Sequence, residues 1–258
     1  MNNIWTITRK ELKSFFTSPI GYIVLSLFSM LAGWFFFNHL NRFNSLVAFY
    51  QMSQQPDVLN QINLNQFVVV RLFQELLMLL SVFLPGISMR LFAEEKKQKT
   101  IELLFTSPVH TYEIILGKYF SVIIFLCIML GLTAIYPLIL FIYGSPGPEL
   151  APIITGYIGL FFVGACILSI GVFASSITEN QIIAFASTLS ISLLFYIIGL
   201  LASAGGPQIG ELLTYLSLKE HFNRLAVAFI DTRTFVYFLS FIFVWLFLTY
   251  RAIEGLRK

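Results

Sequence analysis

Two charged residues stand inside an apolar run of this sequence, at a spacing that could line a polar path. Arg71 and Glu75 are four residues apart, so they share one face of a helix. Ionisable side chains at such positions usually face a cavity or another helix. Glu75 would lie about 22 Å from Arg90 along that helix, in the outer part of a membrane. One interpretation is a polar lining at the outer end of a path. The other is a late-starting span in which Arg71 extends to the surface and pairs with Glu75.

Residues 99–118 have the pattern of a docking element between two apolar runs. A helix is expected to start at Thr100 and to stop at Pro108, and another is expected to start near Thr111 and lead into the next apolar run. The first of these helices would carry four apolar side chains, Ile101, Leu103, Leu104 and Phe105. Such a patch suits a soluble partner, and packing against lipid or against the chain's own spans is the alternative.

Sequence motifs for catalysis and for phosphate binding are absent from the chain. The pair Gly117-Lys118 is followed by Tyr119 and lacks the earlier glycine of a nucleotide-binding P-loop, and neither H-E-x-x-H nor a nucleophile elbow occurs. The three histidines are widely separated, at His39, His110 and His221. The two cysteines lie in apolar runs, at Cys127 and Cys166, and are expected to be buried. We therefore expect no catalytic residue and no metal or cofactor bound by this chain.

The composition indicates an integral membrane protein. Of 258 residues 57% are hydrophobic and 11% are charged, whereas soluble domains carry roughly 25% charged residues. The mean hydropathy is +0.83, and a net charge of +3 is too small to indicate nucleic acid as a partner. Six segments reach the length of about 20 apolar residues that a spanning helix needs: 20–37, 67–89, 119–143, 153–177, 182–202 and 234–250. The expected fold is a single all-α polytopic membrane domain, 1–258.

Three segments outside the spans have their own patterns. Residues 1–18 form an amphipathic helix with Glu11 inside the apolar arc; it would lie at the membrane interface, or Glu11 would meet a basic group of a partner. Residues 38–66 are polar and are expected to form a partly flexible outer loop. The outer segment 203–233 is expected to form two short re-entrant helices, joined near 217–219. Leu216, Phe222 and Phe229 would face lipid or a second protomer. The residues expected at the path or outer gate are Leu216, His221 and Phe222.

The distribution of lysine and arginine gives the orientation. Of the sixteen basic residues, eleven fall in the N-terminal segment, the segment between the second and third spans, and the C-terminal tail, and four fall on the opposite side. Basic residues are enriched in cytoplasmic loops. Both termini and residues 90–118 are therefore expected in the cytoplasm.

Short blocks along nearly the whole chain have the order and spacing of one known family. They are Arg9-Lys10-Glu11, Ser18-Pro19-Ile20-Gly21-Tyr22, Pro85-Gly86-Ile87-Ser88-Met89-Arg90, Glu94-Glu95-Lys96-Lys97, Thr100-Ile101-Glu102-Leu103-Leu104, Ser107-Pro108, Leu116-Gly117-Lys118, Gly171-Val172-Phe173-Ala174-Ser175-Ser176, Glu179-Asn180-Gln181, Leu216-Ser217, His221-Phe222 and Asp231-Thr232-Arg233. With its six spans, the sequence resembles the permease subunits of type-2 ABC exporters, and most of all their gliding-motility-associated branch. That branch commonly has Gly where this chain has Lys99, and lysine adopts a left-handed turn less readily than glycine.

The resemblance implies a membrane-spanning exporter subunit in the bacterial inner membrane. Two copies, or two related chains, would pair around the path, with separate cytoplasmic ATPase subunits that bind ATP and Mg, and with an auxiliary periplasmic or membrane subunit. Residues 94–108 would form a cytoplasmic coupling helix in a cleft of the ATPase, with Leu103, Leu104 and Phe105 as buried anchors. The polar rim would comprise Glu94, Glu95, Lys96, Lys97 and Glu102. The same docking set includes Thr100, Ser107 and Pro108.

Two other functions stay open on the sequence. An ion-coupled transporter acting alone would need charged groups near the membrane midplane and an internal repeat. The last four spans have no acidic or basic residue in their interiors and no convincing repeat. A membrane assembly factor without transport would keep the docking element and would need no lined path. Hydrolysis by a co-purifying ATPase that depends on this chain would exclude the ion-coupled transporter.

Overall fold

The computed structural model describes residues 2–53, 63–100, 109–144, 147–204 and 206–257. Throughout these ranges every regular element is a helix. Six of the helical segments are long and apolar enough to cross a membrane. The all-α polytopic class is therefore confirmed, and the chain is a multi-pass membrane protein.

The helices follow one another with short connections. The first half of the chain contains α1 (Asn2–Thr17), α2 (Pro19–Met52), the π-helical turn η1 (Asn65–Val69), α4 (Val70–Ser88) and α5 (Arg90–Lys97). The second half contains α7 (Thr111–Thr133), α8 (Ile135–Tyr143), α9 (Leu150–Ile177), α10 (Gln181–Ile197), the 3₁₀ helix η2 (Ile198–Ala204), α11 (Gly206–Leu216), α12 (Leu218–Ala226) and α13 (Thr232–Arg257). The candidate spans are α2, η1–α4–α5, α7–α8, α9, α10–η2 and α13.

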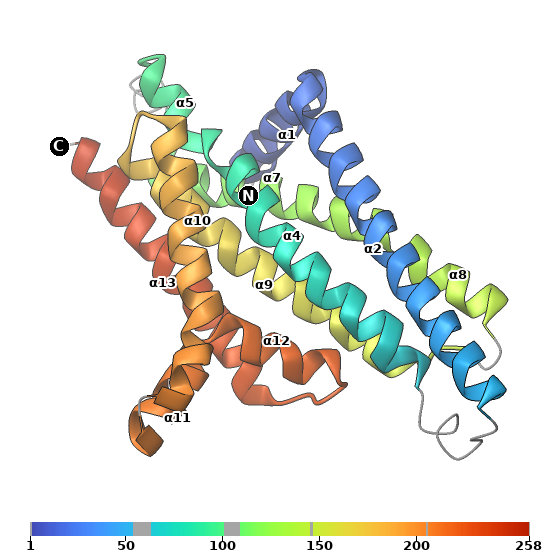
Figure 1. Cartoon of the computed structure of the whole chain (residues 1–258). Coiled ribbons are helices and arrows are strands. Elements are labelled where there is room, and N and C mark those ends of the chain that lie inside the picture. Colours follow the sequence, from blue (N-terminus) through green and yellow to red (C-terminus); the bar gives the residue numbers. More distant parts are fainter. Residues whose placement is uncertain (1, 54–62, 101–108, 145–146, 205, 258) are drawn as a thin grey trace.

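The spans alternate in direction between two ends of the bundle (Figure 1). At one end, called the α5 end, lie α1, α5 and the turn between α9 and α10. At the other, called the α12 end, lie η1, α8, α11 and α12. The N-terminal helix α1 and the last turns of α13 are both at the α5 end, as an even number of spans requires.

The central helix of the bundle is α9. It packs against α4, α7, α10, α12 and α13, and most of its side chains are buried. Its glycines let these neighbours approach: Phe73 of α4 occupies the space where a side chain at Gly156 would stand, and Ser88 does the same at Gly171. Small residues at helix crossings are the main route to close packing inside a bilayer, where lipid is as apolar as the helix surface.

The first span is longer than its apolar run, and the predicted outer loop at 38–66 is wrong up to Met52, where α2 ends. Beyond Trp34, α2 contains no proline or glycine that would end it. Its polar side chains bond back to the helix, as the Asn38 amide does to the Trp34 carbonyl oxygen at 2.9 Å. At 1.5 Å per residue, α2 is about 51 Å long, which exceeds the roughly 30 Å hydrocarbon core of a bilayer. Residues 54–62 of the predicted loop lie outside the described part of the chain.

The third span consists of two helices and begins earlier than its apolar run. It starts at Thr111, and α7 ends at Thr133. Pro137 causes this break, because its ring has no N–H to donate and excludes the carbonyl group of Thr133 from the normal helical position. The chain continues as α8 for nine residues.

The outer segment folds as two short helices, as the sequence predicts, and they meet at Ser217. The Ser217 hydroxyl accepts a hydrogen bond from the Glu220 N–H at 3.4 Å and so starts α12. The prediction that Phe222 faces lipid or a second protomer is wrong, because its side chain is fully buried and lies against Gly159 of α9. An amphipathic pattern identifies an apolar face but does not identify what covers it.

Candidate functional site at the junction of α1, α5 and α7

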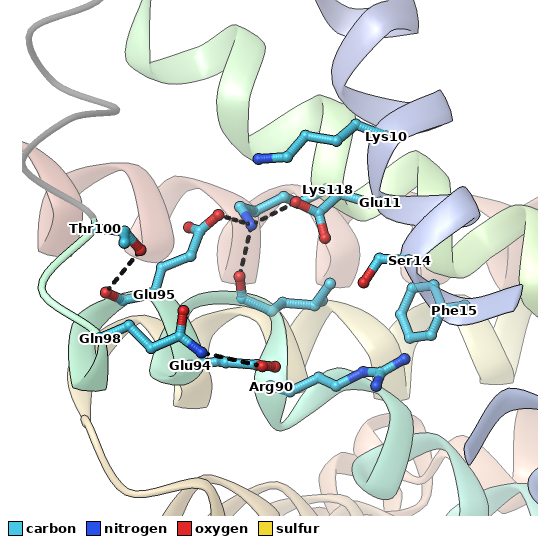
Figure 2. A pocket seen from close by; sticks show the side chains of 11 residues that line it. Lys10, Glu11, Ser14, Phe15, Arg90, Glu94, Glu95, Gln98, Thr100 and Lys118 are labelled. Atoms are coloured by element: carbon cyan, nitrogen blue, oxygen red, sulfur yellow. Dashed lines mark hydrogen bonds and ion pairs between the residues drawn. The ribbon is translucent and has the colours of Figure 1, made fainter. Parts of the chain in front are cut away.

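A polar cavity of about 310 Å³ opens between α1, α5 and α7 at the α5 end (Figure 2). Its walls carry charges of both signs. The charged residues that line it are Lys10 and Glu11 of α1, Arg90, Glu94 and Glu95 of α5, and Lys118 of α7. Three helices from three separate parts of the sequence therefore contribute charged side chains to one place.

Lys118 connects these helices. Its side chain is only 1% exposed, and its ammonium nitrogen Nζ lies 2.9 Å from Glu11 Oε1, 2.9 Å from Glu95 Oε1 and 2.7 Å from the Leu91 carbonyl oxygen (Figure 2). Three acceptors match the three N–H donors of an ammonium group. The ring of Phe92 lies 5.1 Å from Nζ and adds a cation–π contact. Loss of Lys118 would leave two carboxylates without their cation, so the three helices depend on it.

The Lys118 contacts change two expectations from the sequence. The basic group that meets Glu11 belongs to the same chain and not to a partner. Lys118 itself, counted as a boundary charge that indicates orientation, is buried. The signal that could have suggested this pair is the position of Glu11 inside the apolar arc of its helix, because an acidic residue there needs a buried partner.

The first helix lies along the first turns of α7 and runs in the same direction. The Asn3 amide donates to the Glu113 carboxylate at 3.2 Å, and the Thr8 hydroxyl donates to the Gly117 carbonyl oxygen at 3.0 Å. At Gly117 the two helices touch so closely that an added Cβ atom would stand 2.8 Å from Ile7. The glycine of the Leu116-Gly117-Lys118 block is thus required by the approach of α1.

The end of α5 overturns the prediction of one coupling helix over residues 94–108. Lys99 has a φ of 57°, in the left-handed region. The Lys99 N–H donates to the Lys96 carbonyl oxygen at 3.0 Å, and the Thr100 N–H donates to the Glu95 carbonyl oxygen at 2.9 Å. These two bonds form a Schellman motif, which ends a helix. Glu94 and Glu95 therefore belong to a helical extension of the second span, and this helix ends before Lys99.

Part of the predicted docking set can be placed. Glu94 is half-buried and its Oε1 accepts a hydrogen bond from the Gln98 amide at 3.4 Å. Glu95 gives one carboxylate oxygen to Lys118, while its Oε2 is buried with no hydrogen-bond partner in the described part of the chain. Thr100 is exposed. Lys96 is half-buried and Lys97 is exposed. The remaining members of the set lie outside the described residues: Ile101, Glu102, Leu103, Leu104, Phe105, Ser107 and Pro108.

Arg71 and Glu75 lie on α4 toward the α12 end. Arg71 is exposed and its guanidinium carbon is 5.4 Å from the centre of the Phe67 ring. Glu75 is half-buried, and among the described residues neither of the two forms an ion pair. The sequence allowed a late-starting span in which Arg71 extends to the surface and pairs with Glu75. The structure shows the exposed Arg71 side chain but no such pair.

The predicted gate residues His221 and Leu216 are joined through other side chains of the α12 end. The His221 Nε2 lies 2.8 Å from the Tyr215 carbonyl oxygen, so Nε2 carries the proton and donates, while Nδ1 accepts from the Thr234 hydroxyl at 3.3 Å. The ring stacks on Tyr237, whose hydroxyl donates to the Leu216 carbonyl oxygen at 2.6 Å. Burial lowers the pKa of His221 below its ordinary value of 6.5. These contacts hold α11, α12 and α13 together and make His221 a neutral packing residue.

The cysteines differ from each other. Cys166 is buried in α9, as the sequence predicts, whereas Cys127 is exposed on α7. The exposed position lies in an apolar helix of a membrane protein, so the expectation of burial within the chain is wrong for Cys127 alone.

Comparison with known protein families identifies a match over nearly the whole chain. A family model described as "ABC-2 family transporter protein" matches residues 5–252, nearly the whole chain. A search of the curated proteins found no match.

Proposed function

Because this chain belongs to the ABC-2 family of transporter proteins, we propose that it is the membrane-spanning subunit of an ATP-driven exporter. Membership makes it a membrane permease of an ABC-type system. In the proposed complex, two copies, or this chain and a related permease, form the translocation path. Separate ATPase subunits bind ATP and Mg and dock at the α5 end, and an auxiliary membrane or periplasmic subunit completes the assembly.

One observation supports this role above the others: Lys118 fixes α1, α5 and α7 to one another. Residues 101–108 of the predicted docking element 94–108 join α5 to α7 in the sequence. α5 is the last part of the second span and only Met89 separates it from α4, α7 is the start of the third span, and α1 leads into the first. A displacement of the docking segment by an ATPase would therefore be passed to three spans through one buried contact, as rigid-body coupling requires.

The proposed orientation places the α5 end in the cytoplasm of a bacterium, with the bundle in the inner membrane. The support is the distribution of lysine and arginine, eleven of sixteen on that side. A reporter fused after Lys258 is then expected to be active only in its cytoplasmic form. Activity of a periplasmic reporter at the same position would refute the orientation.

The experiment that tests the function is co-purification of the full chain with its ABC ATPase, followed by measurement of ATP hydrolysis with and without the chain. Hydrolysis that depends on the chain is expected, and it would exclude an ion-coupled transporter acting alone. Leu103→Asp is expected to abolish association, because a carboxylate in a buried contact would have no partner. Asn180→Asp is the matched control, since it adds a negative charge at the same end and can still cap α10. Normal association of the Leu103→Asp protein would refute the docking assignment.

A further inference from the structure

A second cavity lies at the α12 end, between α2 and α4. Its volume is about 380 Å³. Two arginines face it from the two helices, Arg42 of α2 and Arg71 of α4, and both are exposed. The remaining polar residues that line it all belong to α2: Asn38, His39, Asn41 and Ser45. Neither arginine forms an ion pair with any residue that the structure describes, so their charges are available to a ligand.

His39 gives this cavity an unsatisfied polar wall. The residue is 8% exposed, and neither Nδ1 nor Nε2 has a hydrogen-bond partner in the described part of the chain. A buried imidazole with two unbonded nitrogens is unusual, because most buried polar atoms are paired with protein or with ordered water. An anion in the cavity, or a water that it holds there, would supply the missing partner.

The depth of the two arginines follows from counting along both helices. Near the α5 end, the Arg90 guanidinium lies 4.3 Å from the centre of the Phe15 ring, and the Phe15 carbonyl group touches Gly21 at the start of α2. The two helices therefore start from a common level. Along α2 it is about 32 Å from Gly21 to Arg42, and along α4 it is about 28 Å from Arg90 to Arg71. Both distances match the roughly 30 Å thickness of the hydrocarbon core, so the arginines lie at the headgroup level of the opposite leaflet.

An exposed apolar stripe continues from the cavity toward the middle of the membrane. On α2, the face that carries Asn38 and Asn41 also carries Leu27, Met30, Leu31 and Trp34, at helical spacing. On α4, the face that carries Arg71 also carries Met78 and Val82, with the half-buried Glu75 between Arg71 and Met78. All six apolar side chains are exposed. A cationic pocket at headgroup level with an apolar stripe below it matches the shape and polarity of a single phospholipid.

We propose that the cavity between α2 and α4 binds the phosphate group of an anionic phospholipid in the leaflet at the α12 end. Arg42 and Arg71 hold the phosphate oxygens through charge-assisted hydrogen bonds. The acyl chains lie along the stripe that includes Trp34 and Met78. Glu75, one turn deeper on α4, does not line the cavity, although its charge acts on His39 in the cavity wall. A free phosphate would use the arginines and leave the stripe uncovered, which is why the lipid is the favoured source.

The test is native mass spectrometry of the full chain titrated with phosphatidylglycerol or with phosphatidylcholine of the same acyl chains. Wild type is expected to prefer phosphatidylglycerol. Arg42→Gln/Arg71→Gln is expected to reduce that preference about tenfold or more, since each basic residue at a membrane surface contributes a sizeable attraction to anionic lipid. Its binding of phosphatidylcholine is expected to stay unchanged, which also reports that the variant is folded.

The matched control is Arg224→Gln/Arg233→Gln, which removes the same charge from exposed positions at the same end of the bundle. It is expected to keep the preference, as is Arg42→Lys/Arg71→Lys. An equal loss in the control would overturn the proposal, because general attraction would then explain the binding. An unchanged preference in the Arg42→Gln/Arg71→Gln protein would also overturn it. Displacement of phosphatidylglycerol by inorganic phosphate would identify free phosphate as the ligand and overturn the lipid assignment.

Discussion

The ammonium nitrogen of Lys118 lies 2.9 Å from a carboxylate oxygen of Glu11, although 107 positions separate the two residues in the sequence. The contact fixes the N-terminal helix to the third span. The same nitrogen is 2.9 Å from Glu95, so the extension of the second span is fixed as well. One buried cation therefore sets the relative positions of three helices, two of which flank residues 101–108 in the sequence.

Replacing Lys118 by methionine is expected to destabilise the protein by about 3–5 kcal/mol, because the Glu11 and Glu95 carboxylates would lose the buried cation that contacts both of them. Lys97→Met is the control, since Lys97 is an exposed lysine of the same end. The measurement is thermal unfolding in detergent. Adding Glu11→Gln and Glu95→Gln to Lys118→Met is expected to recover much of the loss. Equal melting temperatures of the Lys118→Met and Lys97→Met proteins would contradict a structural role for the contact.

Gly117→Ala is expected to destabilise the protein by about 1–3 kcal/mol, because its methyl group would stand 2.8 Å from Ile7 and push α1 away from α7. Gly131→Ala in the same helix is the matched control, since an added Cβ there meets nothing within 4 Å. The control is expected to leave the melting temperature unchanged or slightly higher. Equal melting temperatures of the Gly117→Ala and Gly131→Ala proteins would contradict the close packing of α1 on α7.

Lys99→Gly is expected to stabilise the end of α5 by about 1 kcal/mol, because glycine adopts a positive φ without the steric cost that a side chain carries. Lys99→Ala removes the same charge and keeps the Cβ atom, so it is expected to bring no such gain. Thermal unfolding of the two variants beside wild type separates the backbone effect from the charge effect. An equal gain in stability in the Lys99→Gly and Lys99→Ala proteins would show that the effect comes from the loss of the lysine charge and not from the backbone.

The stability of the α12 end is expected to depend on pH through His221. Burial lowers its folded pKa below the unfolded value of 6.5, so the unfolded chain takes up a proton more readily. The contribution of neutral His221 to the stability of the folded protein is therefore complete above a pH of about 6.5. It is lost as the pH falls through the lowered folded pKa. Melting temperatures of wild type and His221→Gln across this range are expected to converge toward low pH. Parallel curves would show that His221 does not titrate in this way.

The six spans follow from the sequence because apolar runs of sufficient length report directly on a bilayer environment. The end of the first span could not be predicted in the same way. The stretch from Asn38 to Met52 contains many polar residues, yet it is helical, and its side chains form hydrogen bonds to the helix backbone that a hydropathy average does not take into account. The two helices of the outer segment follow from their amphipathic pattern and from the capping residue Ser217.

The candidate site was only partly predictable. The resemblance described in the sequence analysis implies a glycine at the position of Lys99, and glycine readily adopts the left-handed backbone that Lys99 has in the structure. The Lys118–Glu11 contact is not foreshadowed by local pattern, because it joins residues that come together only when α1 packs along α7. The burial of His39 without hydrogen-bond partners could not be predicted from the sequence either, because it depends on the packing of α2 against α4.

Coupling through Lys118 is tested by ATP hydrolysis of the reconstituted complex of this chain with its ABC ATPase, compared between Lys118→Met and Lys13→Met, which changes an exposed lysine of α1 at the same end. Both variants are expected to bind the ATPase, because neither substitution replaces a residue of the predicted docking set. Hydrolysis in the Lys118→Met complex is predicted to fall to the rate of the ATPase alone, while the Lys13→Met complex keeps the wild-type rate. Equal hydrolysis in the two complexes would contradict coupling through the junction of α1, α5 and α7.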